Sequence, residues 1–170
     1  MASGRSEAPI GDLPIVALLG SVGDLAGCSL AGLSGETLET NEDPTPLMLR
    51  CSSAWRTPLD ALTCEQVRLL VGQDLGVAWL GPVALEILRS RPCAIVMGYP
   101  GDLASSVLSS FASVFASDPA GARAFLEKDF SWIDCLRETD DAFGDRRHSD
   151  EAQALLEKAR ALAAGYRRRR

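Results

Sequence analysis

The sequence predicts a mainly α protein, a compact bundle of about five helices with an irregular N-terminal extension. From residue 63 onward, apolar residues recur at helical spacing, as in Val67, Leu70 and Val71. Residues that cap helices stand just ahead of several of these segments. The 170 residues, 46% of them hydrophobic, suffice for one domain with a core. No run approaches the roughly 18 apolar residues that a membrane-spanning helix needs.

The N-terminal segment differs in composition from the rest of the chain. Residues 1–45 are rich in Gly, Pro and Ser, so we expect an irregular extension there. Its apolar run, Ile15 to Leu19, is compatible with a short strand or with a docked segment, and periodicity does not decide between them. The helical domain is expected over 46–164, followed by an Arg-rich tail over 165–170.

Two helices are predicted in the first part of the helical domain. Thr63 and Gln66 have the spacing of a capping box, which marks the start of the first helix. The second helix is expected over about 77–89, where apolar residues form a wide face. Pro82 is placed in its first turn or so, where a missing amide hydrogen costs little.

Capping residues also divide the following stretch into helices. Asp102 is predicted to cap a third helix, over about 103–116. Asp118, followed directly by a proline, is predicted to cap a fourth helix that reaches about residue 136.

The last part of the chain is more polar. The segment 140–147 is interpreted as a solvated, charged linker. Ser149 is predicted to cap a final amphipathic helix, over about 150–163. The four arginines that end the chain are expected to form a frayed, solvated tail.

The charge balance indicates which partners suit the protein. Its 23 acidic and 17 basic residues give a net charge of −6. Four of the basic residues are the terminal arginines, and the rest of the chain has a net charge of −10. Such a body repels DNA and RNA, so we expect no direct nucleic-acid binding and no membrane binding. A basic polypeptide would be attracted. Many toxins that cut nucleic acid are basic, so an acidic protein is a sensible inhibitor of one.

The cysteines and the lone histidine give no sign of a metal or cofactor. The five cysteines are widely spaced, with no C-x-x-C pair, so neither a disulfide framework nor a zinc site is predicted. Scattered free cysteines and the lack of a secretion signal favour the cytoplasm. The lipoprotein-like box that ends at Cys28 is interpreted as accidental, because Asp24 stands beside it.

No catalytic residue is predicted. A pairing of Cys64 with His148 would need the two side chains within hydrogen-bond reach, and nothing in the pattern brings them together. Asp140 and Asp141 could in principle serve acid–base chemistry, but their polar surroundings favour a solvated face. Tyr99 to Asp102 forms the most distinctive turn, either a rigid corner between helices, which we favour, or a recognition corner.

Two motifs together resemble a known family. The helix-pair motif is Gln66-x-Arg68-Leu69-Leu70-Val71-Gly72-Gln73-x-Leu75-Gly76-Val77-x-x-Leu80-x-Pro82-x-Ala84-Leu85-x-x-Leu88. The turn motif, after a short loop, is Tyr99-Pro100-Gly101-Asp102-Leu103. In order, spacing and residue type they resemble the immunity proteins of bacterial contact-dependent growth inhibition systems, over about residues 30–128.

The resemblance implies an inhibitor, not an enzyme. Such a protein sits in the cytoplasm and binds the toxin domain, often a nuclease, at the C-terminal end of a large exported protein. Binding would occlude the active or substrate-binding surface. Because specificity must differ between pairs, we expect the contacts from acids in the variable parts: Glu36, Glu39, Glu42, Asp43, Asp134, Glu138, Asp140 and Asp141. The motif residues are expected to be structural: Arg68, Gln73, Gly76, Pro82, Tyr99, Pro100, Gly101 and Asp102.

Two alternatives stay open at this point. One is a helical adaptor that binds nucleic acid or membrane through its Arg tail. The other is a small enzyme that uses Cys64 or paired acids. The sequence does not predict an oligomeric state.

Overall fold

The computed structural model describes residues 8–127, 131–144 and 147–167. In these ranges the chain is mainly α, as predicted, and β structure is limited to isolated bridges. Helices there outnumber the expected five. The elements are α1 (Ile15–Leu19), η1 (Gly23–Leu25), α2 (Leu30–Ser34), α3 (Pro46–Arg56), η2 (Leu59–Ala61), α4 (Cys64–Gly72), α5 (Val77–Ser90), α6 (Asp102–Ser109), α7 (Phe111–Ser117), α8 (Pro119–Glu127), α9 (Ser131–Phe143) and α10 (Arg147–Arg167).

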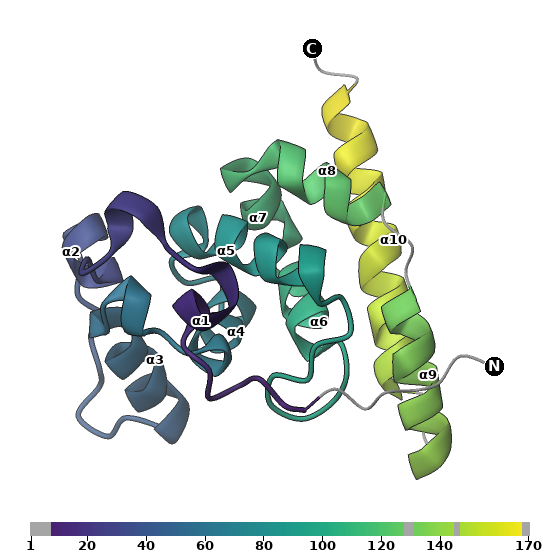
Figure 1. Ribbon diagram of the computed structural model, residues 1–170, viewed down its shortest axis with the longest axis horizontal. Helices are drawn as coiled ribbons and strands as arrows, with labels where there is room; N and C mark the ends of the chain where they lie inside the picture. The colour runs from purple at the N-terminus through teal and green to yellow at the C-terminus, as the bar shows by residue number, and fades with distance from the viewer. Residues whose placement is uncertain (1–7, 128–130, 145–146, 168–170) are drawn as a thin grey trace.

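Helix α5 lies at the centre of the fold (Figure 1). It packs against α4, α6, α7 and α8, and its residues Leu80, Ala84 and Ile87 are fully buried. The long α10 packs along α9 and α6 on one side of the molecule, while α2 and α3 lie on the other. The wide apolar face predicted for this helix explains why it packs against several neighbours.

The N-terminal extension is more ordered than predicted. The run Ile15 to Leu19 forms the one-turn helix α1, not a strand, and α2 adds a second short helix. Ile10, Ile15 and Leu30 are buried in the main core. The amide of Ile15 donates a hydrogen bond to the carbonyl of Leu62 (2.8 Å), which holds the extension on the helical domain. A helix of one turn is too short to show a repeat of apolar residues in the sequence. Such a short helix is stabilised by its tertiary packing.

Helix α3 was not predicted, although its start carries a helix signal. The Thr45 hydroxyl accepts a hydrogen bond from the amide of Met48 (3.3 Å), and Pro46 occupies the first helical position. Trp55 and Ala54 face the core. Polar residues inside the helix, among them the buried Ser52, obscured the apolar periodicity.

Two predictions about the motif residues were wrong in detail. Asp102 is the first residue of α6 and not its N-cap, which is Gly101 with a φ of 80°. Pro82 lies in the second turn of α5, where, against the prediction of a low cost, the carbonyl of Ala78 loses its usual helical amide partner. The predicted third helix is also broken in two at Ser110, whose hydroxyl donates to the carbonyl of Val71 (2.6 Å).

The C-terminal part is more helical than predicted. Asp118 caps α8 as expected, accepting a hydrogen bond from the amide of Gly121 (2.9 Å). Of the predicted fourth helix, α8 is described to Glu127 and α9 from Ser131, and residues 128–130 lie outside the described part of the chain. In the predicted linker at 140–147, residues 140–143 belong to α9 and Arg147 begins α10, ahead of the predicted cap Ser149, while residues 145–146 lie outside the described part of the chain. Helix α10 also enters the predicted tail, whose residues 168–170 lie outside the described part of the chain.

The capping box at α4 yields the first testable prediction. Replacing Thr63 with Ala removes the hydroxyl that accepts from the amide of Gln66 (3.3 Å). The free energy of unfolding should fall by about 1 kcal/mol, the usual cost of losing such a cap. Urea titration followed by circular dichroism measures the change. Replacing Thr63 with Ser keeps the hydroxyl and serves as the control. If alanine and serine behaved alike, the cap would contribute nothing.

Candidate functional site: the outer side of α4 and the Asp102 loop

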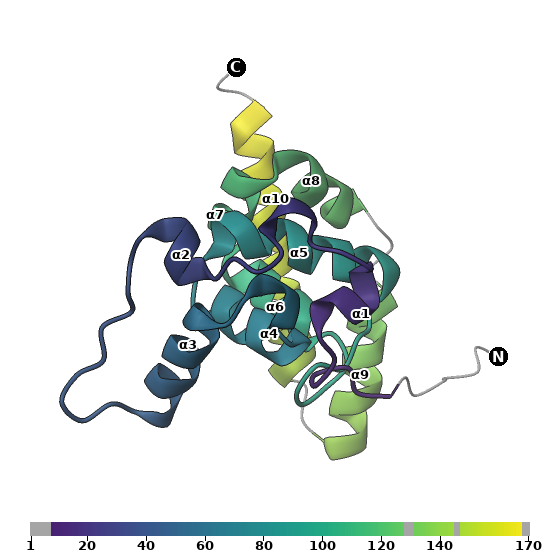
Figure 2. The same ribbon diagram turned by 60° about the vertical axis from the view of Figure 1, so that its left-hand side comes forward.

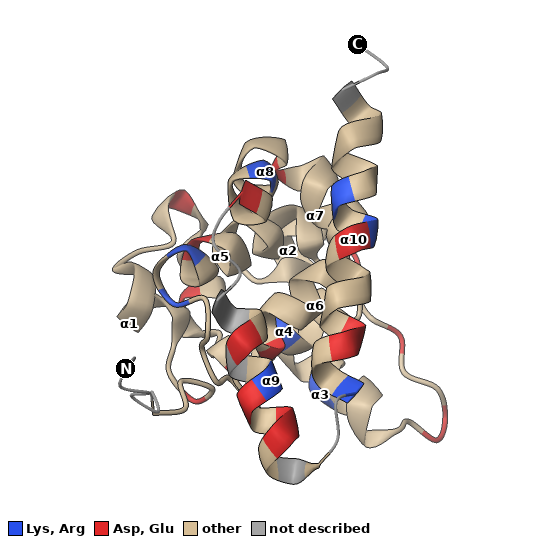
Figure 3. Cartoon of the chain, turned by 90° about the vertical axis from the view of Figure 1, so that its right-hand side faces the viewer, with Lys and Arg blue, Asp and Glu red and all other residues tan. Residues whose placement is uncertain are grey.

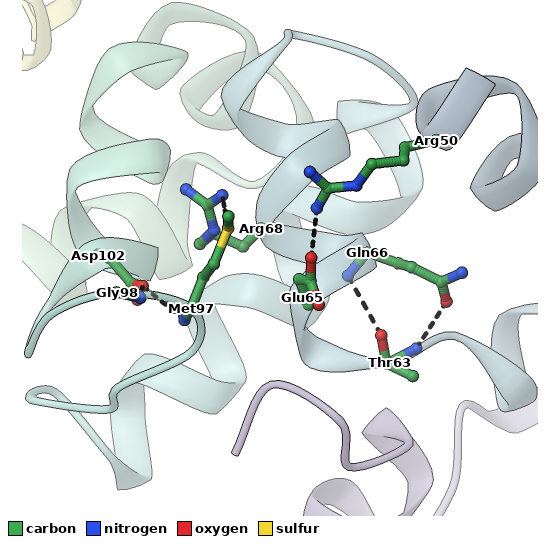
Figure 4. Close-up of polar contacts among 8 residues, drawn as sticks. All are labelled: Arg50, Thr63, Glu65, Gln66, Arg68, Met97, Gly98 and Asp102. Atoms are coloured by element: carbon green, nitrogen blue, oxygen red, sulfur yellow. Dashed lines mark hydrogen bonds and ion pairs between the residues drawn. The ribbon is translucent and has the colours of Figure 1, made fainter. Parts of the chain in front are cut away.

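The first turn of α4 is fixed by reciprocal hydrogen bonds. The amide of Thr63 donates to the side-chain oxygen of Gln66 (3.0 Å), and the amide of Gln66 donates back to the Thr63 hydroxyl (Figure 4). The sequence predicted this capping box, and the structure confirms it. The turn is therefore a rigid base for the side chains that follow.

Charged side chains of α4 link this helix to its neighbours. Glu65 forms an ion pair with Arg50 of α3. Beside this pair, a hollow of about 230 Å³ lies between α3 and α4, lined by Arg50, Ser53, Thr63, Glu65, Gln66 and Leu69. One turn further on, the Arg68 guanidinium donates to the sulfur of Met97 (2.9 Å), in the loop between α5 and α6. Figure 4 shows both contacts on one side of α4.

Asp102 holds that loop in place. Its carboxylate is buried, with the residue 1% exposed, and accepts three backbone hydrogen bonds. The amide of Val96 donates to Oδ1 (3.1 Å), and those of Met97 and Gly98 donate to Oδ2 (2.7 and 3.0 Å). The acid thus caps the loop before α6 and not the helix itself. This contact supports the structural role predicted for Asp102 and presents Met97 at a fixed position.

Tyr99 connects the turn motif to the C-terminal helices. Its ring lies 4.6 Å from the His148 ring, centroid to centroid. Burial raises the pKa of Tyr99, against the opposing effect of a hydrogen bond with Ser105. The turn is thus covered by the start of α10, which suits a rigid corner between helices.

Asp140 was expected on a solvated face, and this was wrong. The residue is 2% exposed, so it is not available for direct contact with a partner. Its Oδ1 lies 2.9 Å from Nδ1 of His148, and its Oδ2 accepts from the amide of Ser149 (2.7 Å). Desolvation tends to raise the pKa of Asp140, but the hydrogen bonds from Ser149 and His148 outweigh it and lower the pKa. The acid fastens α10 to α9.

The other predicted acids form two separate groups. Glu36, Glu39, Glu42 and Asp43 are exposed in the segment between α2 and α3. Asp134, Glu138 and Asp141 are exposed on α9, where Asp134 pairs with Arg137 (3.0 Å). Figures 1 and 2 place α9 and the α2–α3 segment on opposite sides of the molecule. One flat partner surface cannot cover both groups.

The remaining motif residues occupy positions that suit a role in the fold. Gln73 is exposed and follows the last residue of α4. Gly76 adopts a φ of 62°, and a Cβ there would lie 2.8 Å from a methyl carbon of Leu30. Only glycine therefore fits the tight turn between α4 and α5 without displacing its neighbours.

The geometry disfavours the predicted alternative of cysteine catalysis. Cys64 is fully buried, and burial raises the pKa of its thiol to about 11, against a smaller opposing effect of Arg91. A thiol with such a pKa is a poor nucleophile near neutral pH. His148 is engaged with Asp140 instead. In the described ranges no three His, Cys, Asp or Glu side chains gather as a metal site, and no helix is long and apolar enough to cross a membrane.

Residues 34–123 match the family of CDI immunity proteins, those of contact-dependent growth inhibition. The match covers more than half of the 170 residues, so this chain belongs to that family, which carries out toxin-neutralising immunity. The resemblance seen in the motifs is thereby confirmed. No curated protein and no solved structure shows a significant match. The matched region contains α3 to α7, the hollow beside α4 and the Asp102 loop, whereas α9 and α10 lie outside it.

Proposed function

We propose that this protein binds the cognate toxin domain of a large exported protein and occludes its active or substrate-binding surface. The toxin domain is proposed to be a nuclease, and the protein to act in the cytoplasm as a stoichiometric inhibitor without catalysis. Membership of the CDI immunity family carries the proposal. The net charge of −6 supports it, since an acidic protein can occupy the basic groove in which a nuclease holds its substrate.

Exposed acidic residues also favour the fast association with a basic toxin that an inhibitor of this kind needs. The segment 34–49 contains four acids and neither Lys nor Arg, and all four acids are exposed. The negative electrostatic potential of these acids raises the association rate with a basic partner at low salt. Complex formation should therefore slow markedly as salt concentration rises.

Co-expression tests the proposal. The toxin domain encoded beside this gene should arrest growth alone, and co-expression of this protein should restore growth. The purified proteins should form a 1:1 complex by size-exclusion chromatography with light scattering. Cleavage of nucleic acid should stop at one equivalent of inhibitor. An immunity protein of unrelated sequence is the control. Unrestored growth with no complex would refute the proposal, and inhibition far below one equivalent would refute stoichiometric occlusion.

A further inference from the structure

Large apolar side chains that face solvent are concentrated around α3 and α4. In the described residues five are exposed: Leu13 (40%), Leu47 (42%), Leu49 (52%), Met97 (55%) and Tyr166 (52%). Four of the five belong to α3 or to segments that contact the first two turns of α4. Single exposed apolar residues are ordinary, but a group of them marks an interaction surface.

The contacts show how these segments meet at α4. The carbonyl of Leu13 accepts from the amide of Cys64 (3.0 Å), so the N-terminal segment lies against the start of the helix. Leu49 precedes Arg50, which pairs with Glu65. Met97 receives the Arg68 guanidinium. Arg50 and Met97 therefore lie on the outer side of α4, as Figure 4 shows, and Leu49 is the residue that precedes Arg50 on α3.

This side of the molecule is built to be rigid. The Thr63 capping box fixes the first turn of α4, and Asp102 fixes the loop that carries Met97. The hollow of about 230 Å³ beside the Arg50–Glu65 pair has room for a side chain of a partner. A surface that is ordered before binding loses little conformational entropy on association.

Exposed acids near α3 are concentrated in the segment that precedes this helix. The segment that leads into α3 holds Glu42 and Asp43 without any Lys or Arg between residues 34 and 49. On α9 and α10, acidic and basic residues are interspersed, as Figure 3 shows. The α3–α4 side also carries Arg50, paired with Glu65, and Arg68 beside Met97. Exposed apolar side chains with exposed acids in the adjoining segment suit a protein interface toward a basic partner.

We infer that the toxin domain docks on the α3–α4 face, defined as Leu13, Leu49, Met97 and the hollow between α3 and α4, with Glu42 and Asp43 at its edge. This inference rests on the proposed function and assigns the surface that carries it out. The partner presents apolar side chains to Leu49 and Met97, one of them at the hollow, and basic side chains to the two acids. Helices α9 and α10 stay outside the interface.

Charge-introducing variants test the inference. Leu49→Arg and Met97→Arg should each raise the Kd for the toxin domain at least tenfold, since each places a cation and a long side chain at an apolar position of this face. Tyr166→Arg is the matched control, an equally exposed apolar residue on α10, and its Kd should stay within twofold of the parent protein. Circular dichroism melts verify that all three variants fold. Isothermal titration calorimetry gives the affinities.

Hydroxyl-radical labelling of the unmodified protein provides a test that needs no variant. Oxidation of Met97 and Leu49 should drop about tenfold in the complex, while Tyr166 stays equally reactive. If the unmodified protein forms no complex, the proposed function fails. If it forms the complex while Met97 and Leu49 stay reactive, or while both arginine variants bind within twofold, the assignment of the α3–α4 face fails and the proposed function stands.

Discussion

Replacing Asp102 with Ala is expected to lower the free energy of unfolding by about 3 kcal/mol. The buried carboxylate accepts hydrogen bonds from the amides of Val96, Met97 and Gly98, and alanine would leave all three without a protein acceptor. An unsatisfied buried amide costs about 1–3 kcal/mol. Because the contacts of Met97 and Gly98 are only partly buried, water can replace part of that loss.

Urea titration measures this loss, and a thermal melt should show a shift of about 6–12 °C for a chain of this size. Asp102→Asn keeps one acceptor oxygen and should fall between alanine and the parent protein. Asp43→Ala, at an exposed acid in the segment before α3, is the control and should change stability by no more than about 0.5 kcal/mol. An alanine variant as stable as this control would show that the loop does not depend on Asp102.

Replacing Asp140 with Ala should loosen the attachment of α10 and cost about 2 kcal/mol at pH 7. The carboxylate accepts from the amide of Ser149 and contacts His148, whose ring lies on Tyr99. Hydrogen bonds to a charged group contribute about 1.5–3 kcal/mol each. Hydrogen exchange should locate the effect, with faster exchange of amides at the start of α10. Asp141→Ala, at the exposed neighbouring acid, is the matched control and should leave those amides protected.

The effect of Asp140 should also depend on pH. Since the folded protein lowers the pKa of this carboxyl, its contribution to stability is fully present above the unfolded pKa of about 3.9 and is lost as pH falls through the folded pKa. The difference in unfolding free energy between the parent protein and Asp140→Ala should therefore shrink as pH falls below about 4. A difference that did not shrink at all between pH 4 and pH 2 would contradict a charged carboxylate as its source.

Local signals accounted for the central helices. Thr63 and Gln66 predicted the start of α4, and Asp118 predicted the start of α8, because each cap involves residues three positions apart. Local sequence patterns did not predict helix boundaries that depend on contacts with residues far away in the chain. The break at Ser110 is one such case, since its hydroxyl bonds to a carbonyl 39 residues earlier in the chain.

The candidate site was only partly predictable. Charge and the family motifs indicated an acidic protein that neutralises a toxin, and the motif residues Arg68 and Asp102 lie at the candidate site. Met97, Leu49 and the Arg50–Glu65 pair were missed. Arg50 and Glu65 lie 15 residues apart, so no local pattern joins them. The sequence does not distinguish an exposed apolar residue from a buried one, because its exposure depends on the tertiary structure.

The sequence by itself determined the helical class, the rigid caps of α4 and α8, the acidic charge and the family, because these follow from composition and from spacing along the chain. Only the tertiary structure decided that Asp140 is buried, that Asp102 holds a loop, and that the acids separate into two groups. These properties arise from contacts between segments far apart in sequence, and the burial and hydrogen bonding of each group depend on which segments surround it.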